Sequence, residues 1–150
     1  MSRRGASNAM QQICPACAAD PDTHSFKRLK EKNGVTLFYT RPANATQYKD
    51  TEGILAHVDN AIASLEGKKW ICIIDGEDFD IRHATEISTG YGIYELLTTK
   101  YGASLVELKI INPTWHINGV IKAIKSWASQ DFIDKLTVLD DRQYSVLQFL

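Results

Sequence analysis

Two cysteines and a nearby histidine are the residues of this chain whose types and spacing best suit chemistry. Cys14-Pro15-Ala16-Cys17 has the spacing of a zinc knuckle, and His24 follows as a conceivable third ligand. A structural zinc site needs four ligands, so a fourth would have to come from another histidine, a carboxylate or another chain. The remaining thiol, Cys72, lies in an apolar run typical of a protein core. From the sequence alone we therefore treat Cys14 and Cys17 as loop residues and assign no metal.

The same cysteine pair is a poor candidate for redox catalysis. A thioredoxin-type motif opens a helix directly after a strand, whereas Cys14 and Cys17 precede the first strand that the sequence predicts. The odd total of three cysteines also favours a reducing compartment over a disulfide framework.

An acidic stretch, DGEDFD at 75–80, is the second candidate for chemistry. An EF-hand loop that begins at Asp75 would place Asp80 where the sharp turn requires glycine, and Phe79 where an oxygen ligand is needed. We therefore predict a solvated acidic loop. An enzyme built on Asp75, Glu77 and His83 would match no known template.

Motifs for nucleotide binding and for hydrolysis are absent from the sequence. Neither G-x-G-x-x-G nor G-x-x-x-x-G-K-[ST] follows a predicted strand, and G-x-S-x-G does not occur. We predict no catalytic residues and no cofactor.

Alternating strands and helices must position any site in this chain. Residues 1–25 are expected to form an irregular leader, residues 26–150 one α/β domain, and residues 26–32 one or two helical turns. Short apolar or β-branched runs predict strands at 35–40, 70–74, 105–111 and 136–139, and apolar residues at helical spacing predict helices at 49–66, 85–100 and 117–127. This pattern predicts a single mixed or parallel sheet of four to five strands covered by helices.

Composition and charge exclude several classes of protein. A net charge of −1 gives no general attraction to nucleic acid. No apolar run approaches the roughly 18 residues of a membrane span, and the first residues lack the apolar region of a signal peptide. We predict a cytoplasmic protein.

One segment, 101–141, carries a family resemblance. It contains a Tyr and a Leu at the start of a strand, two Ile before an Asn, a Trp just beyond, and a Lys-apolar-x-Val-Leu run. The matching residues are Tyr101, Leu105, Ile110, Ile111, Asn112, Trp115, Lys135, Val138 and Leu139. This order resembles the second half of a CRAL-TRIO (Sec14-like) lipid-binding domain, whose pattern reads roughly Y-P-x-x-L, I-I-N-x-P-W and K-I-x-V-L.

The match to that pattern is divergent. Gly102 stands where the family usually has Pro, Pro113 follows the Asn directly, and His116 takes a place usually given to an apolar residue. The divergent members of the family are therefore the better comparison, and we expect a minimal, truncated domain of this kind.

The resemblance implies an apolar cleft with a sheet as its floor and the helix after Asn112 as its wall. Residues 117–127 would form the wall, residues 130–134 the gate, and Trp115 the corner. The expected ligand-binding residues are Ile73, Tyr94, Ile110, Trp115, Ile117, Ile121, Ile124 and Phe132. The expected function is binding or transfer of a lipid or other hydrophobic molecule without chemistry.

Two kinds of further partner follow from the same comparison. Lys122 and Lys125 on the polar side of the wall helix would allow a transient, weak contact with a membrane surface. The alternative function is a protein-interaction module without a lipid cavity, because divergent relatives of this fold bind small GTPases or dimerise. That alternative is favoured if the wall helix packs fully onto the sheet and leaves no cavity.

Overall fold

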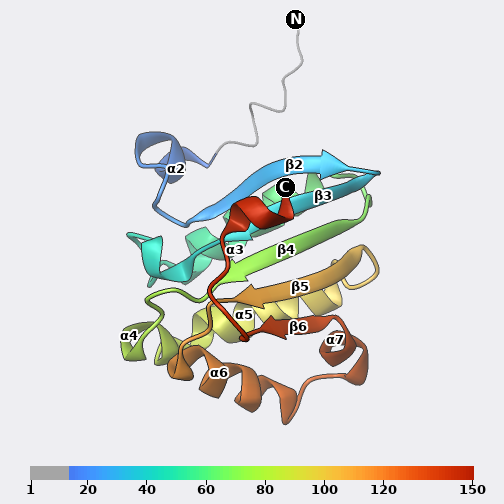
Figure 1. Ribbon diagram of the computed structural model, residues 1–150. Helices are drawn as coiled ribbons and strands as arrows, with labels where there is room; N and C mark the ends of the chain where they lie inside the picture. Colours follow the sequence, from blue (N-terminus) through green and yellow to red (C-terminus); the bar gives the residue numbers. More distant parts are fainter. Residues whose placement is uncertain (1–13) are drawn as a thin grey trace, which may run out of the picture.

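A five-stranded sheet with helices on one face forms the framework of the protein. The computed structural model describes residues 14–150, so the first part of the expected leader lies outside the described residues. The strands are β2 (Phe26–Lys32), β3 (Val35–Thr40), β4 (Trp70–Asp75), β5 (Leu105–Ile111) and β6 (Leu136–Leu139), in the spatial order β2-β3-β4-β5-β6 (Figure 1). The predicted α/β class with a mixed sheet is confirmed.

Most helices of residues 14–150 lie between strands in the sequence, while one precedes the first strand and one follows the last. The α-helices are α2 (Pro15–Ala19), α3 (Thr51–Ala63), α4 (Ile81–Ala84), α5 (Ile87–Thr99), α6 (Trp115–Lys125) and α7 (Gln130–Asp134), and the 3-10 helices are η2 (Pro42–Asn44) and η3 (Val146–Phe149). None of the helices within residues 14–150 is long and apolar enough to cross a bilayer.

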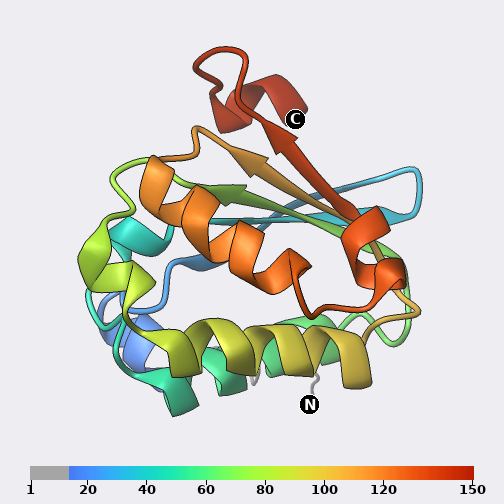
Figure 2. The same cartoon turned by 90° about the horizontal axis from the view of Figure 1, so that it is seen from below.

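The order of the strands explains why the helices share one face. β3, β4, β5 and β6 are parallel neighbours and follow one another in sequence. Connections between parallel strands are almost always right-handed, so units added in one direction place their helices on the same side. Figure 2 shows α3, α5 and α6 on that side, with the C-terminal segment on the other.

The prediction of helical turns at 26–32 is wrong, because these residues form β2. β2 pairs antiparallel with β3 through a tight turn at Asn33 and Gly34, whose φ angles are 56° and 80°. Asn-Gly strongly favours such hairpins, so pairing with β3 overrides the charged composition of 26–32. Charged side chains also suit β2 because it is an edge strand.

The core lies between the sheet and its helices. Its largest part is formed by Phe38, Ile54, Val58, Ile62, Leu65, Trp70, Cys72, Leu97, Leu105, Leu108 and Phe132, and a second cluster contains Phe79, Ile110, Ile117 and Ile121. Cys72 is 3% exposed, as its apolar surroundings in the sequence predict. Burial raises the pKa of its thiol to about 12, which makes it unreactive.

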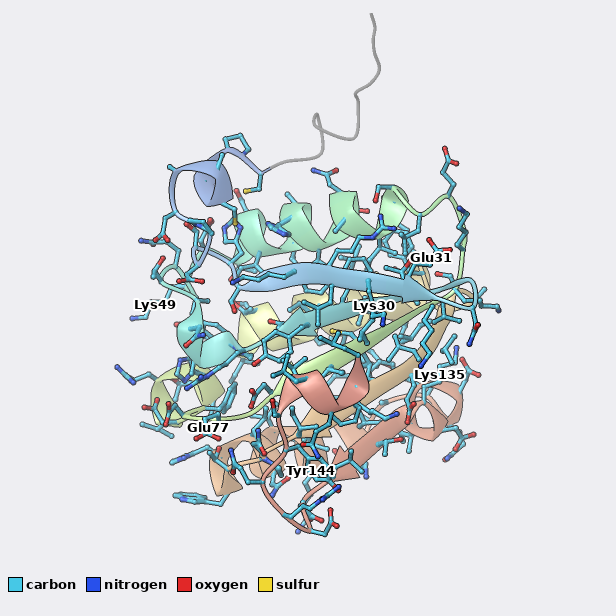
Figure 3. All side chains as sticks on the ribbon, turned by 45° about the horizontal axis from the view of Figure 1, so that its top comes forward. Lys30, Glu31, Lys49, Glu77, Lys135 and Tyr144 are labelled. Atoms are coloured by element: carbon cyan, nitrogen blue, oxygen red, sulfur yellow. The ribbon has the colours of Figure 1, made fainter. Side chains whose placement is uncertain are left out.

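The C-terminal segment is fastened to the sheet by Asn112. The Asn112 amide oxygen accepts a hydrogen bond from the Tyr144 N–H (2.7 Å), and its nitrogen donates to the Tyr144 carbonyl (2.9 Å) and the Asp75 carboxylate (3.1 Å). Figure 3 views this face, with Lys30 on β2 and Tyr144 in the segment that crosses the sheet. The amide of Asn112 thus mainly satisfies backbone groups.

Asn112→Ala is expected to lower the free energy of unfolding by about 1–3 kcal/mol, because it leaves the Tyr144 N–H and part of Asp75 without partners. The left-handed backbone conformation at position 112, with a φ angle of 50°, is also less favourable for alanine than for asparagine. Urea unfolding measures the loss. The control Asn118→Ala removes an exposed amide on α6 and should change stability by less than about 0.5 kcal/mol. Equal effects would show that Asn112 does not hold the segment.

Candidate functional site

An apolar groove lies between the α4–α5 segment and α6, the predicted wall helix. It has a volume of ≈ 470 Å³. Its lining comprises Tyr48, Phe79, Ile81, His83, Ala84, Glu86, Ile87, Gly90, Tyr91, Trp115, His116, Gly119, Val120, Ala123, Ile124 and Trp127. We refer to these residues as the α5–α6 groove.

The rim of the α5–α6 groove exposes large apolar side chains to water. Ile87 is 76% and Trp115 77% exposed, and Ile81, Tyr91 and Trp127 are each about half exposed. Phe79 and His83 are buried below them, at 5% and 8% exposure. An exposed apolar patch of this kind commonly marks a binding surface.

A hydrogen-bonded turn fixes the wall formed by α6. The Thr114 hydroxyl caps α6 by accepting a hydrogen bond from the Ile117 N–H (3.3 Å), and it donates to the Phe79 carbonyl (2.6 Å). Ile117 and Ile121 then pack against Ile110 of β5. The buried side of α6 is therefore seated on the sheet, and the groove opens along its other side.

His83 is the titratable group at the base of the groove. Its Nδ1 accepts a hydrogen bond from the Asp80 N–H (3.1 Å), so the neutral ring carries its proton on Nε2. The ring packs against Tyr48 and Phe79, with centroids 5.0 and 5.1 Å away. Burial, the largest cause, lowers the pKa of His83, which keeps the base of the groove uncharged at neutral pH.

A smaller cavity lies deeper in the molecule, between the sheet, α3 and α5. Its volume is ≈ 110 Å³, and most of its lining is apolar, including Phe26, Val58, Trp70 and Leu97. This space is too small for a lipid, because ligand pockets typically measure about 300–1,000 Å³.

The eight residues predicted to bind ligand are divided by the structure. Trp115 and Ile124 line the α5–α6 groove, whereas Ile110, Ile117 and Ile121 pack together beneath α6. Tyr94 and Phe132 stack edge to face at 4.8 Å, next to Trp127, which lines the groove.

Ile73 is a predicted site residue that lies on the sheet face opposite the expected cleft. It is 0% exposed, and along β4 it alternates with Cys72 and Ile74, which line the cavity on the helix side. Because successive strand residues point to opposite faces, Ile73 lies on the face without the helices.

The side of the groove formed by α4 and the start of α5 was missed by the sequence analysis. It includes Ile81, Ile87 and Tyr91. A usable signal existed, because Ile87 and Tyr91 are one turn apart on a helix whose other apolar residues, such as Leu97, already supply a core face.

The acidic stretch does not gather into a catalytic cluster. Asp75 accepts a hydrogen bond from the Tyr39 hydroxyl (2.6 Å) on the sheet face opposite the groove, and Asp78 pairs with Arg41 (2.7 Å). Glu77 accepts a hydrogen bond from Gln143, and Asp80 caps α4. Of these four carboxylates, only that of Asp80 lies beside His83, 3.4 Å from its Nδ1 atom, and the others have structural partners elsewhere.

The N-terminal cysteines and His24 do converge, and a residue that the sequence analysis did not identify joins them. Cys14, Cys17, His24 and His57 place one ligand atom each within 4.8 Å of one another. His57 lies on α3, far from the other three in sequence, so local spacing gave no signal for it.

Comparisons with known proteins point to one family. The sequence model of the CRAL/TRIO domain matches residues 24–150. A search of curated proteins found no significant match. Among 22 matching chains of solved structures, Sfh5 shares 11% identity at a TM-score of 0.66, over 81% of this chain and 50% of that one. The chain thus spans about half the length of that structure, and the likeness concerns the fold.

The free energy of unfolding is expected to fall as the pH drops below about 6.5, the ordinary pKa of histidine. In the unfolded chain His83 then becomes protonated, whereas in the folded protein its lowered pKa keeps it neutral. Urea unfolding between pH 7.5 and 5 should show a shallower fall for His83→Gln. The imidazole can also be titrated directly by NMR, and a midpoint at or above 6.5 would contradict this account.

Proposed function

The chain belongs to the CRAL/TRIO domain family, and from this premise we propose that it binds a lipid or other hydrophobic molecule in the α5–α6 groove, without altering it chemically. The family binds hydrophobic ligands, which supports the general kind of function. The observation that carries the proposal is the groove itself, with exposed apolar side chains along its rim and ≈ 470 Å³ of space between them.

The size and lining of the groove suit a slender apolar ligand. Its volume lies within the usual range for ligand sites, and each methylene group buried there would contribute about 0.8 kcal/mol. The uncharged base at His83 and Phe79 avoids the cost of placing an apolar chain against an ion. No covalent step is needed, because sheltering the ligand from water is sufficient.

A transient contact with a membrane surface is part of this proposal. Lys122 and Lys125 are exposed on α6, the helix that forms one wall of the groove. Each cation near an anionic membrane contributes about 1 kcal/mol, so two of them would orient the groove only weakly. The apolar rim, including Trp115 and Trp127, would supply most of the attraction.

The cytoplasm is the compartment that we propose for this protein. All three cysteines are free, and free thiols are typical of reducing compartments.

Protein interaction is the second candidate function, and a specific observation favours it. Ile117 and Ile121 of α6 pack onto the sheet, as expected for an interaction module, although the α5–α6 groove beside α6 departs from the expected absence of a cavity. The exposed rim of the groove would then receive a side chain or helix of a partner, such as a small GTPase or a second copy of this chain.

Native mass spectrometry of the purified protein, followed by organic extraction, is the first test. We expect a ligand adduct with a stoichiometry of one, either as purified or after incubation with mixed-lipid vesicles, and extraction should identify a lipid or another hydrophobic molecule. A mass that stays free of ligand under both conditions would contradict lipid binding and leave protein interaction as the function to pursue.

Filling the groove should abolish binding without harming the fold. Gly90 on α5 and Gly119 on α6 line the groove, and a Cβ at either position meets no atom within 4 Å. The double variant Gly90→Leu/Gly119→Leu is expected to weaken ligand binding at least tenfold. Leucine should also favour both helices, by about 1 kcal/mol per site, so loss of binding would not reflect unfolding.

Ala56→Leu is the matched control for the filled groove. It adds a leucine to the exposed side of α3, away from the α5–α6 groove. Its ligand affinity should equal that of the unaltered protein, as measured by competition with a fluorescent fatty acid. Unchanged affinity in the double variant would place the ligand elsewhere in the molecule.

A further inference from the structure

Four side chains that prefer metal ions converge where the N-terminal segment meets α3. Cys14 is the N-cap of the short helix α2 and Cys17 lies within it, His24 lies two residues before β2, and His57 lies in the middle of α3. His24 is only 4% exposed. The convergence joins residues 33 and 40 positions apart in sequence, so it is not a by-product of local spacing.

Four of the six distances between these atoms agree with the edges of a zinc tetrahedron, and all six are within 4.8 Å. The Nδ1 atom of His24 lies 3.6 Å from the Sγ atom of Cys14 and 3.6 Å from that of Cys17. The Nδ1 atom of His57 lies 3.4 Å from Cys17 Sγ and 3.5 Å from His24 Nδ1. Zinc bonds of about 2.0–2.1 Å to nitrogen and about 2.3 Å to sulfur give N–N edges of about 3.3 Å and S–N edges of about 3.6 Å.

Hydrogen bonds fix the tautomer of both imidazoles. His57 Nε2 lies 2.9 Å from the Phe26 carbonyl oxygen, which can only accept a hydrogen bond, so Nε2 carries the proton. His24 Nε2 lies 3.0 Å from the Asp50 carboxylate and donates to it in the same way. In the neutral rings each Nδ1 atom therefore points its lone pair toward the Nδ1 atom of the other ring and toward the thiols. The two nitrogen lone pairs repel each other, and a cation bound between them removes this repulsion.

These outer hydrogen bonds are the ones that metal-binding histidines usually make. A ligating imidazole typically donates its second N–H to a carboxylate or a backbone carbonyl, which fixes the ring and raises its basicity. His24 has a carboxylate partner, Asp50, and His57 has a backbone carbonyl partner. Gly53 leaves room for the His24–Asp50 pair, because a Cβ atom at position 53 would lie 2.8 Å from His24 Nε2 and closer still to Asp50.

We propose that Cys14, Cys17, His24 and His57 bind one zinc ion in a structural site. Two thiolates and two imidazoles match the ligand preferences of Zn²⁺ and complete a tetrahedron without an open position for water or substrate. The ion fastens the segment before β2 to α3. It also fixes His24, which lines the small inner cavity. The proposal does not depend on a ligand in the α5–α6 groove.

A disulfide between Cys14 and Cys17 is the main competing arrangement. It would use both thiols but would leave the two facing imidazole nitrogens without a role. It also predicts a protein that takes up zinc only after reduction, or not at all.

Metal analysis of the reduced protein, purified without chelator, tests the proposal. We expect one zinc per chain by elemental analysis, and a native mass that exceeds the denatured mass by one zinc ion. Cys17→Ser and His57→Ala should each lose stoichiometric zinc. The control Cys72→Ala removes the buried thiol outside the cluster and should retain it.

Two further measurements keep the test decisive if a ligand variant fails to fold. Adding Co²⁺ alone to the metal-free, reduced, unaltered protein should give the visible bands of tetrahedral cobalt and a thiolate charge-transfer band, both displaced by Zn²⁺. Asp50→Asn, which retains all four ligands, should weaken zinc binding about 10- to 100-fold. No stoichiometric uptake of either metal by the reduced protein, or full zinc affinity in His57→Ala, would overturn the proposal.

Discussion

The constraint on which the rest of this structure depends is the handedness of its strand connections. Four parallel strands added in one direction by right-handed crossovers must carry their helices on a single face of the sheet. The opposite face would then be open to water, with Ile73 and Ile111 upon it, yet both residues are 0% exposed. The C-terminal segment supplies that cover, and Asn112, at the end of β5, holds it in place.

The α5–α6 groove follows from how the helices share that face. α5 packs chiefly against α3, while α6 is seated over β5 by Ile117, Ile121 and Ile110. Each of the two helices buries its apolar face against a different neighbour, so α5 and α6 do not need to pack closely against each other to complete the core. The side chains between them, such as Tyr91 and Trp127, are consequently left half in water.

Periodicity in the sequence predicted most of this framework because burial is a local pattern on helices and strands. The helices near 51–63 and 115–125 and the strands β3 to β6 all follow from it. β2 was missed because an edge strand with the sequence FKRLKEK has little apolar alternation, and only its pairing with β3 makes it extended. The order of the strands is likewise a property of the assembled sheet.

The sites were harder to predict than the framework, since they join segments that are remote in sequence. Trp115 and Ile124 were found through the family pattern, but Ile81 and Ile87 come from a connection whose path the sequence does not specify. His57 is a similar case, because its neighbour Val58 marks it only as part of a helix near the core.

The placement of the three tryptophans gives the molecule a built-in optical reporter. Trp70 is 1% exposed beneath the helices, whereas Trp115 and Trp127 line the α5–α6 groove at 77% and 49% exposure. Indole emission shifts to shorter wavelength when water is excluded. A molecule bound in the groove would therefore shift the emission of Trp115 and Trp127 and leave that of Trp70 as an internal reference. Occupancy of the groove can thus be followed by fluorescence without attaching a dye.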